Sequence, residues 1–259
     1  MRITKELLEE KGACGDGIEW FSDHFPSLDA DYQDVLTELG KQNRLDYAEW
    51  LFKNIGGTDD VLEVDEIVSE NSFYFAGTVK VSKGIKVKFS IKAGRGIEAG
   101  RGIKAGWGIE AGRGIKAGRG IEAGCGIEAG DGIKAGRGIK AGWGIEAGWG
   151  IEAGCGIEAG DGIKAGDGIK AGRGIKAGWG IEAGWGIEAG CGIEAGDGIK
   201  AGRGIKAGWD IKAGWGIEAG DEYGIYAGIR VKINCWKIYA NVSAETKPKN
   251  LISGYWIDK

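Results

Sequence analysis

The sequence predicts a mainly β protein: a three-faced parallel β-solenoid with a small α-helical domain before it and a cap after it. The first observation is a six-residue repeat, Ile-(Lys/Glu)-Ala-Gly-x-Gly, which runs from Ile91 to Ile217 and contains 22 isoleucines without a break. The second is that the charges in these repeats alternate with a longer period of three repeats. An even period suits β-strands, whose side chains alternate between two faces, and does not suit helices.

Each repeat predicts a short strand followed by a corner. Ile and Ala are two residues apart and face one side of the strand, while the Lys or Glu between them faces the other. The variable residue x is Arg, Trp, Cys or Asp, and Arg and Asp cannot be stacked in a dry core without partners. We therefore place Gly-x-Gly at a corner with x turned outward, where glycine can supply a positive φ.

The charged position of the repeat predicts how many strands make one turn. Residues stacked in neighbouring turns prefer opposite charges. Between Lys92 and Glu218, opposite pairs number 11 of 21 for adjacent repeats, 12 of 20 for repeats two apart and 16 of 19 for repeats three apart. We therefore expect three hexads, and so three strands, in each turn. At about 4.8 Å per turn, the repeats from Ile67 to Ile217 would span roughly 40 Å.

The solenoid is expected to cover residues 58–233, beyond the regular repeats at both ends. Upstream, the isoleucine position is assigned to Val61, Ile67, Phe73, Val79 and Ile85, and the alanine position to Ser69, Phe75, Val81 and Val87. Downstream, the segment 221–224 lengthens one repeat, after which the period is expected to resume with Ile225, Ala227, Val231 and Ile233. Each turn would bury its apolar face only against its neighbours.

Residues 1–57 predict a small acidic domain of three or four short helices. Thr4 has the position of an N-cap for a first helix that ends before Gly12, and Gly56 and Gly57 would form a hinge into the solenoid. Residues 1–66 contain 6 Lys or Arg against 17 Asp or Glu, a net charge of −11 that leaves +7 for the rest of the chain. We expect this head either to cap the first turn or to contact a partner.

Residues 234–259 predict a C-terminal cap, because open strand edges at the end of a solenoid would invite aggregation. The residues expected to form this aromatic and apolar cap are Trp236, Ile238, Tyr239, Leu251, Tyr255, Trp256 and Ile257.

Charge and composition argue against several classes of protein. A charge of +7 spread over residues 67–259 is too weak for a nucleic-acid-binding surface. The sequence has neither an apolar stretch long enough for a membrane span nor an apolar N-terminal signal core, so we expect no membrane contact and a cytoplasmic location. Five widely spread cysteines fit a reducing compartment better than a disulfide framework.

No catalytic, metal-binding or cofactor-binding constellation stands out, so we expect no enzymatic activity and no cofactor. The one histidine, His24, is expected to lie at the surface or at a helix end. Cys125, Cys155 and Cys191 occupy x positions. The last two would lie two turns apart, about 9.6 Å, which is too far for a disulfide. We interpret all three as tolerated surface thiols.

The candidate binding surface consists of x residues that align along the predicted corners. One corner would carry Trp107, Trp143, Trp179 and Trp215, a second Trp149 and Trp185, and the third Trp209 together with Arg101, Arg119, Arg137 and Arg173. Exposed Trp is typical of contact surfaces, so the rows predict stacking platforms for a protein or a polysaccharide. The alternative is that sequence duplication copied them and that they cover glycine-rich backbone. The arginines would form an anion-attracting ridge or a merely solvated one.

The Gly-Ile-(Lys/Glu)-Ala-Gly repeats resemble those of bactofilins, bacterial cytoskeletal proteins whose triangular β-helical core polymerises end to end. This resemblance covers roughly residues 67–233, and the helical head and aromatic tail depart from it. The repeats also resemble hexapeptide acyltransferases in period, but no histidine lies in the repeats. In the head, the segments Lys11-Gly12-Ala13-Cys14, Trp20-Phe21, Phe25-Pro26 and residues 45–51 resemble a small module of uncharacterised prophage and bacterial proteins, which implies a phage or mobile-element setting.

The sequence thus favours a non-enzymatic scaffold that binds a protein partner, as a monomer or a homodimer. An inhibitor of a host defence complex, encoded by a phage or a mobile element, is one concrete version. A bactofilin-like filament and a carbohydrate-binding rod are the alternatives.

Overall fold

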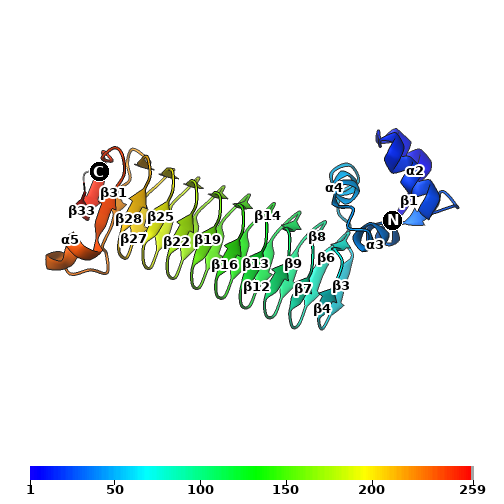
Figure 1. The fold of residues 1–259 in the computed structure, drawn as a ribbon, viewed down its shortest axis with the longest axis horizontal. Coiled ribbons are helices and arrows are strands. Elements are labelled where there is room, and N and C mark those ends of the chain that lie inside the picture. The colour runs from blue at the N-terminus through cyan, green and yellow to red at the C-terminus, as the bar shows by residue number, and fades with distance from the viewer. Residues whose placement is uncertain (258–259) are drawn as a thin grey trace.

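The protein is described by a computed structural model over residues 1–257. A helical head lies at one end of a long rod of stacked strands, and the C-terminal segment lies at the other end (Figure 1). The rod is a parallel β-solenoid of about 11 turns with 18 residues per turn and three sheets. This confirms the predicted fold class. The last two residues of the predicted cap lie outside the described residues.

The head contains four helices, within the number predicted. They are α1 (Lys5–Glu10), α2 (Gly15–His24), α3 (Tyr32–Lys41) and α4 (Leu45–Asn54). The Thr4 hydroxyl accepts a hydrogen bond from the backbone N–H of Leu7 at 3.2 Å, which confirms the predicted N-cap. No sequence pattern indicated the antiparallel pair formed by β1 (Arg2–Thr4) and β2 (Asp29–Asp31).

Three parallel sheets form the faces of the rod, and each is named after its first strand. The β3 face contains β3 (Val61–Val64), β6 (Thr78–Val81), β9 (Ile97–Ala99), β12 (Ile115–Ala117), β15 (Ile133–Ala135), β18 (Ile151–Ala153), β21 (Ile169–Ala171), β24 (Ile187–Ala189), β27 (Ile205–Ala207), β30 (Ile225–Tyr226) and β32 (Leu251–Ser253). The β4 face contains β4 (Ile67–Ser69), β7 (Ile85–Val87), β10 (Ile103–Ala105), β13 (Ile121–Ala123), β16 (Ile139–Ala141), β19 (Ile157–Ala159), β22 (Ile175–Ala177), β25 (Ile193–Ala195), β28 (Ile211–Ala213), β31 (Asn241–Ser243) and β33 (Tyr255–Trp256). The β5 face contains β5 (Phe73–Phe75), β8 (Ile91–Ala93), β11 (Ile109–Ala111), β14 (Ile127–Ala129), β17 (Ile145–Ala147), β20 (Ile163–Ala165), β23 (Ile181–Ala183), β26 (Ile199–Ala201) and β29 (Ile217–Ala219).

Strands pair in register with the strand one turn away. Between β17 and β20, for example, Ile145 pairs with Ile163 and Glu146 with Lys164. The isoleucines of the regular repeats are 0–5 % exposed and the alanines 0–6 %. The predicted stacking of isoleucine on isoleucine therefore forms the core of the rod.

Glycine at the fourth repeat position has a different role from the one predicted. Positive φ is confined to Gly12, Gly56, Gly228 and Gly254 among the described glycines, and none of these lies in the regular repeats. Instead, a Cβ at the fourth position would overlap the carbonyl oxygen of the glycine one turn earlier, as it would at Gly178. The fourth position must be glycine because the turns approach each other so closely there.

Two end assignments were wrong. Leu62, and not Val61, pairs with Val79 in the isoleucine position, because the first turn is one residue shorter than the others. At the other end the period does not resume through Val231 and Ile233: Ile233 is 79 % exposed. The chain there forms a 3₁₀ turn (Ile233–Cys235) and α5 (Trp236–Tyr239), and β31 supplies the missing strand with Val242 fully buried on Ile211. The segment predicted as a cap thus adds strands to two faces of the rod.

Candidate interaction surface

The corners of the rod present one x side chain from each turn, in register. Between the β4 and β5 faces, the backbone N–H of each x residue donates to the carbonyl of the x residue one turn earlier. Trp179 donates to Asp161 at 3.1 Å, and Asp197 donates to Trp179 at 3.1 Å. These bonds fix the position of each side chain along the rod. All seven repeat tryptophans are 44–70 % exposed, which confirms that x points outward.

The corner between the β4 and β5 faces is the tryptophan corner. In order along the rod it carries Trp107, Cys125, Trp143, Asp161, Trp179, Asp197 and Trp215. Its four tryptophans are exposed by 44, 62, 64 and 70 %. Neither Asp161 nor Asp197 forms an ion pair within residues 1–257. The corner is therefore a row of exposed indoles two turns apart, and its C-terminal half has a carboxylate midway between each pair.

The corner between the β5 and β3 faces carries the other predicted pair, Trp149 and Trp185. They are 61 % and 52 % exposed, and the Arg203 guanidinium lies over the Trp185 ring at 4.6 Å, a favourable cation–π contact. Trp143 precedes β17 and Trp149 follows it. The C-terminal half of the β5 face is thus bordered by tryptophan on both sides.

The third corner, between the β3 and β4 faces, is the arginine corner. It brings together the predicted Arg101, Arg119, Arg137 and Arg173, all exposed, with Cys155 and Cys191 between the later arginines and Trp209. Within the described chain none of the four arginines forms an ion pair. The four arginines therefore align along one corner, as expected.

Each face carries a ladder of Lys and Glu that confirms the charge pairing deduced from the sequence. Lys104–Glu122 and Lys134–Glu152 are both separated by 2.9 Å across one turn. The alternation breaks at two places in the regular repeats: Lys116 pairs with Lys134 on the β3 face, and Glu110, Glu128 and Glu146 follow one another on the β5 face. Burial, together with the two neighbouring carboxylates, raises the pKa of Glu128.

A groove of about 1140 Å³ runs along the β5 face beside the tryptophan corner. Its floor is glycine backbone from Gly144 to Gly216, and Trp179 and Asp197 line it on the corner side. The Lys and Glu ladder forms the opposite wall. Residues 246–250 close the groove at the C-terminal end of the rod. This groove combines an aromatic platform, Trp179, with the Asp197 carboxylate and a closed end.

The head covers the first strands of the same β5 face. Helix α3 packs on β5, where Tyr74 is 2 % exposed although its position in the repeat faces outward. In the next turn Lys92 is also buried, with its ammonium 5.4 Å from the Phe52 ring centroid and paired to Glu110 at 2.5 Å. The expected hinge is packed, because Gly57 lies directly against the backbone of Gly94.

Two side-chain amides of the head replace the missing strand beyond β5. Gln33 donates from Nε2 to the Tyr74 carbonyl at 2.9 Å and accepts at Oε1 from the Ala76 N–H at 3.0 Å. The Asn43 carbonyl oxygen accepts from the Ser72 N–H at 2.8 Å. These bonds satisfy backbone groups that an edge strand would leave unpaired. The head therefore caps β5, one of the three strands of the first turn. Capping the first turn was one of the two roles expected for the head.

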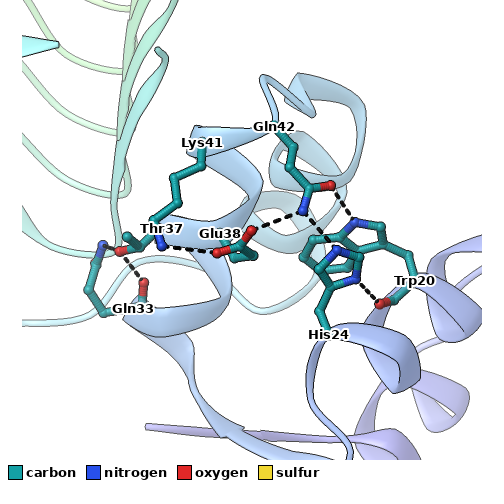
Figure 2. A network of polar contacts seen from close by, with 7 residues as sticks. All are labelled: Trp20, His24, Gln33, Thr37, Glu38, Lys41 and Gln42. Atoms are coloured by element: carbon teal, nitrogen blue, oxygen red, sulfur yellow. Dashed lines mark hydrogen bonds and ion pairs between the residues drawn. The ribbon is translucent and has the colours of Figure 1, made fainter. Parts of the chain in front are cut away.

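His24 belongs to a polar network within the head (Figure 2). It is the last residue of α2, which confirms the helix-end prediction. Its Nδ1 donates to the Trp20 carbonyl at 2.7 Å, and its Nε2 accepts from the Gln42 amide at 2.8 Å. Gln42 also accepts from the Trp20 indole N–H and donates to Glu38. The Nδ1 bond therefore lies within α2, and the Nε2 bond links the end of α2 to Gln42 at the end of α3.

No group of three or more His, Cys, Asp or Glu side chains in residues 1–257 could hold a metal ion. All five cysteines are free. No helix among the described residues is long and apolar enough to cross a membrane.

Sequence reasoning missed the groove and the amides that cap β5. Gln33 and Asn43 sit in ordinary helix and loop positions and carry no pattern. A usable signal was Tyr74, an aromatic residue at the repeat position that otherwise holds Lys or Glu, because such a residue needs a cover.

Comparison with known families matches residues 1–55, essentially the whole head, to the YdhT N-terminal domain. This supports an N-terminal module that is separate from the repeats. No curated protein matches the chain, and no solved structure matches it either.

Proposed function

We propose that the chain is a rod that binds a protein partner through its rows of exposed tryptophans and does not catalyse a reaction. The observation that carries this proposal is the exposure of all seven repeat tryptophans, aligned in rows at fixed spacing. Large exposed aromatic surface is uncommon on proteins without a partner, and Trp is enriched in the residues that dominate binding energy.

The head provides internal support for this proposal. It binds the β5 face through aromatic and charged contacts, including Phe52 on Lys92 and the cover over Tyr74. The middle turns of the same face are bordered by Trp143 and Trp149, and their Glu146 and Lys164 side chains are exposed. A partner bound to the free part of the β5 face would make the same kind of contact that the head makes with the first strands of that face.

The experiment is affinity capture from a bacterial lysate with matched variants. The triple variant Trp143→Ala, Trp179→Ala, Trp215→Ala removes most of one row, and Arg119→Ala, Arg137→Ala, Arg173→Ala changes the arginine corner to the same extent. The proposal expects a protein that the wild type and the arginine variant retain and the tryptophan variant loses. Identical captured sets from all three proteins would refute it.

The concrete version of this function is a cytoplasmic inhibitor of a host defence complex, encoded by a phage or a mobile element. It is supported by the resemblance of the head to a prophage module. Expression of the chain in a host that carries such a defence system should restore phage plating, and the triple tryptophan variant should not. Unchanged plating across a panel of defence systems would remove this version and leave the binding rod.

A second candidate, end-to-end assembly, is favoured by the two ends of the rod. At the first turn β3 and β4 have no neighbour beyond them, and at the last turn the same two faces end in β32 and β33. The β5 face is closed at both ends, by Gln33 of the head and by Asn250, whose amide donates to the carbonyl of Gly220 at 3.3 Å.

The charges and apolar residues of the two ends are also complementary. Residues 59–70 contain six acidic residues and no Lys or Arg, whereas residues 225–257 contain five cations and one acid. Val68 at one end and Ile252 at the other are 66 % and 62 % exposed. Light scattering should show mass rising with concentration in the wild type and not in Val68→Lys. A constant monomer mass at all concentrations would exclude the filament.

A further inference from the structure

The spacing of the tryptophan corner matches one backbone conformation of a bound peptide. Trp143, Trp179 and Trp215 are each two turns apart, which is about 9.6 Å at the usual strand separation. A polyproline II helix repeats every three residues, or about 9.3 Å. An extended strand repeats its side chains on one face at about 6.7 Å, and an α-helix has a pitch of about 5.4 Å. Only the polyproline II repeat stays in phase with three successive indoles.

The groove beside the corner fits such a segment in length. It runs from Gly144 to Gly216 beside the tryptophan corner, with Trp179 on its wall, which is four turns or about 19 Å, and residues 246–250 close it at one end. Six residues in the polyproline II conformation extend over about 19 Å. The glycine floor lets an extended backbone approach closely, and Trp179 on its wall offers the flat aromatic surface on which proline rings pack.

The charges along the row indicate which residues the segment carries. Asp161 and Asp197 lie midway between the tryptophans, and within residues 1–257 neither is paired with a cation. A segment in phase with the indoles would bring one residue of each of its turns close to a carboxylate. Charge complementarity therefore calls for Lys or Arg at every third position.

We propose that this groove binds a proline-rich protein segment of about six residues in the polyproline II conformation, with a basic residue at every third position. This inference rests on the proposed function and names the class of partner segment. The two tryptophans at the next corner do not enter the contact.

The test uses the full chain and the synthetic peptide (Pro-Pro-Arg)₃, with binding measured by calorimetry. (Pro-Pro-Glu)₃ controls for charge and (Gly-Gly-Arg)₃ controls for backbone conformation. We expect (Pro-Pro-Arg)₃ to bind at least tenfold more tightly than either control. Trp179→Ala should weaken binding roughly tenfold. Trp209→Ala, which removes a 51 % exposed tryptophan at the arginine corner, should leave binding unchanged.

A position exchange tests the spacing itself. The double variant Trp179→Asp, Asp197→Trp keeps the composition of the row but moves one indole by a single turn, so that it falls out of phase with the peptide. Loss of binding in this variant, with an unchanged melting temperature, supports the inference. Equal binding by the exchanged protein would show that the spacing plays no part and would overturn it.

The outcome also separates this inference from the proposed function. If the chain captures a protein through Trp143, Trp179 and Trp215 but none of the peptides displaces that protein, the proposed function stands. The same result would refute the polyproline II segment. Binding of a β-linked glucose hexasaccharide to the same tryptophans, with no peptide bound, would replace the peptide by a glycan.

Discussion

The head and the rod achieve stability in opposite ways. In the rod one contact pattern recurs in every turn, so that Ile145 stacks on Ile163 as Ile181 stacks on Ile199. In the head each polar contact is made once, as when Gln42 joins Trp20, His24 and Glu38. A residue of the rod is therefore constrained by its position in the repeat, whereas a residue of the head is constrained by its individual partners.

The largest expected effect tests the positional rule in the rod. Gly178→Ala places a methyl group against the carbonyl of Gly160, whereas the same change at Gly180 leaves 3.5 Å to the nearest carbonyl. Overpacking costs about 1–3 kcal/mol when side chains can shift, and here the obstacle is backbone. We expect Gly178→Ala to lower the free energy of unfolding by at least about 3 kcal/mol.

The matched control is Gly180→Ala, which should cost less than about 1 kcal/mol. Urea denaturation followed by circular dichroism measures both. Equal losses at the two positions would mean that close approach of the turns does not determine which glycines are required.

The second prediction concerns the boundary between the two regions. Gln33→Ala removes both hydrogen bonds to the edge of β5, and the Ala76 N–H becomes a buried donor without a partner. Such a loss should lower the free energy of unfolding by about 1–3 kcal/mol. It should also speed amide hydrogen exchange at Ala76.

Gln42→Ala, which breaks contacts only inside the head, is the comparison. It should leave exchange at Ala76 unchanged. Faster exchange at that residue in both variants would show that the head and the first turn unfold together, and would weaken the distinction between the two regions.

The third prediction tests the charge register of the rod by deletion. Without residues 163–198, two turns, Glu146, Glu152 and Glu158 still face lysines, whereas removal of residues 163–180 alone makes them face glutamates. Each cross-strand charge contact contributes about 0.2–1 kcal/mol. The one-turn deletion should therefore be less stable than the two-turn deletion by about 1–2 kcal/mol, although its rod is longer.

Thermal melting at low salt and in about 1 M salt checks this, because salt screens exposed charges and should bring the two melting temperatures together. If the one-turn deletion melts no lower at low salt, the ladders do not contribute to stability.

The smallest effects are opposite responses to acid. Hydrogen bonds from Gln42 and Lys41 lower the pKa of Glu38 in the head, so the stability that it contributes is present above its unfolded pKa and is lost as the pH falls through the lowered value. In the rod the pKa of Glu128 is raised by burial and by its neighbours, so acidification through that raised value stabilises the fold.

At pH 7 Glu38→Gln should therefore destabilise the protein and Glu128→Gln should stabilise it, each by a few tenths of a kcal/mol because solvent screens the partly exposed Glu38 and the exposed Glu128. Both differences should shrink at pH 4 when unfolding is repeated there. A stabilising Glu38→Gln or a destabilising Glu128→Gln at pH 7 would reverse the signs deduced from the contacts.

The same contrast explains how far the sequence could predict the structure. Because the repeat occurs in many copies, the sequence alone was enough to predict the period, the number of strands per turn and the outward direction of Trp143 or Trp179. Val61 and Ile233 were misplaced where the copies end and a single residue shifts the register. Gln33, Asn43 and the groove could not be foreseen, since they depend on how the head lies on the β5 face and on how residues 246–250 close the last turn.

The double turn that spaces the tryptophans has a genetic consequence. Residues 143–178 and 179–214 are identical except at three positions: Asp167 against Arg203, Arg173 against Trp209, and Gly174 against Asp210. Asp210 replaces glycine because it lies at the end of the rod, where its carboxylate accepts a hydrogen bond from the backbone N–H of Asn241 at 2.7 Å. Unequal recombination between such copies can add or remove one whole double turn while every lysine of these copies still meets a glutamate. A gene of this kind can evolve rods of different length in steps of about 10 Å, and so match the distance between its contacts to the dimensions of whatever it binds.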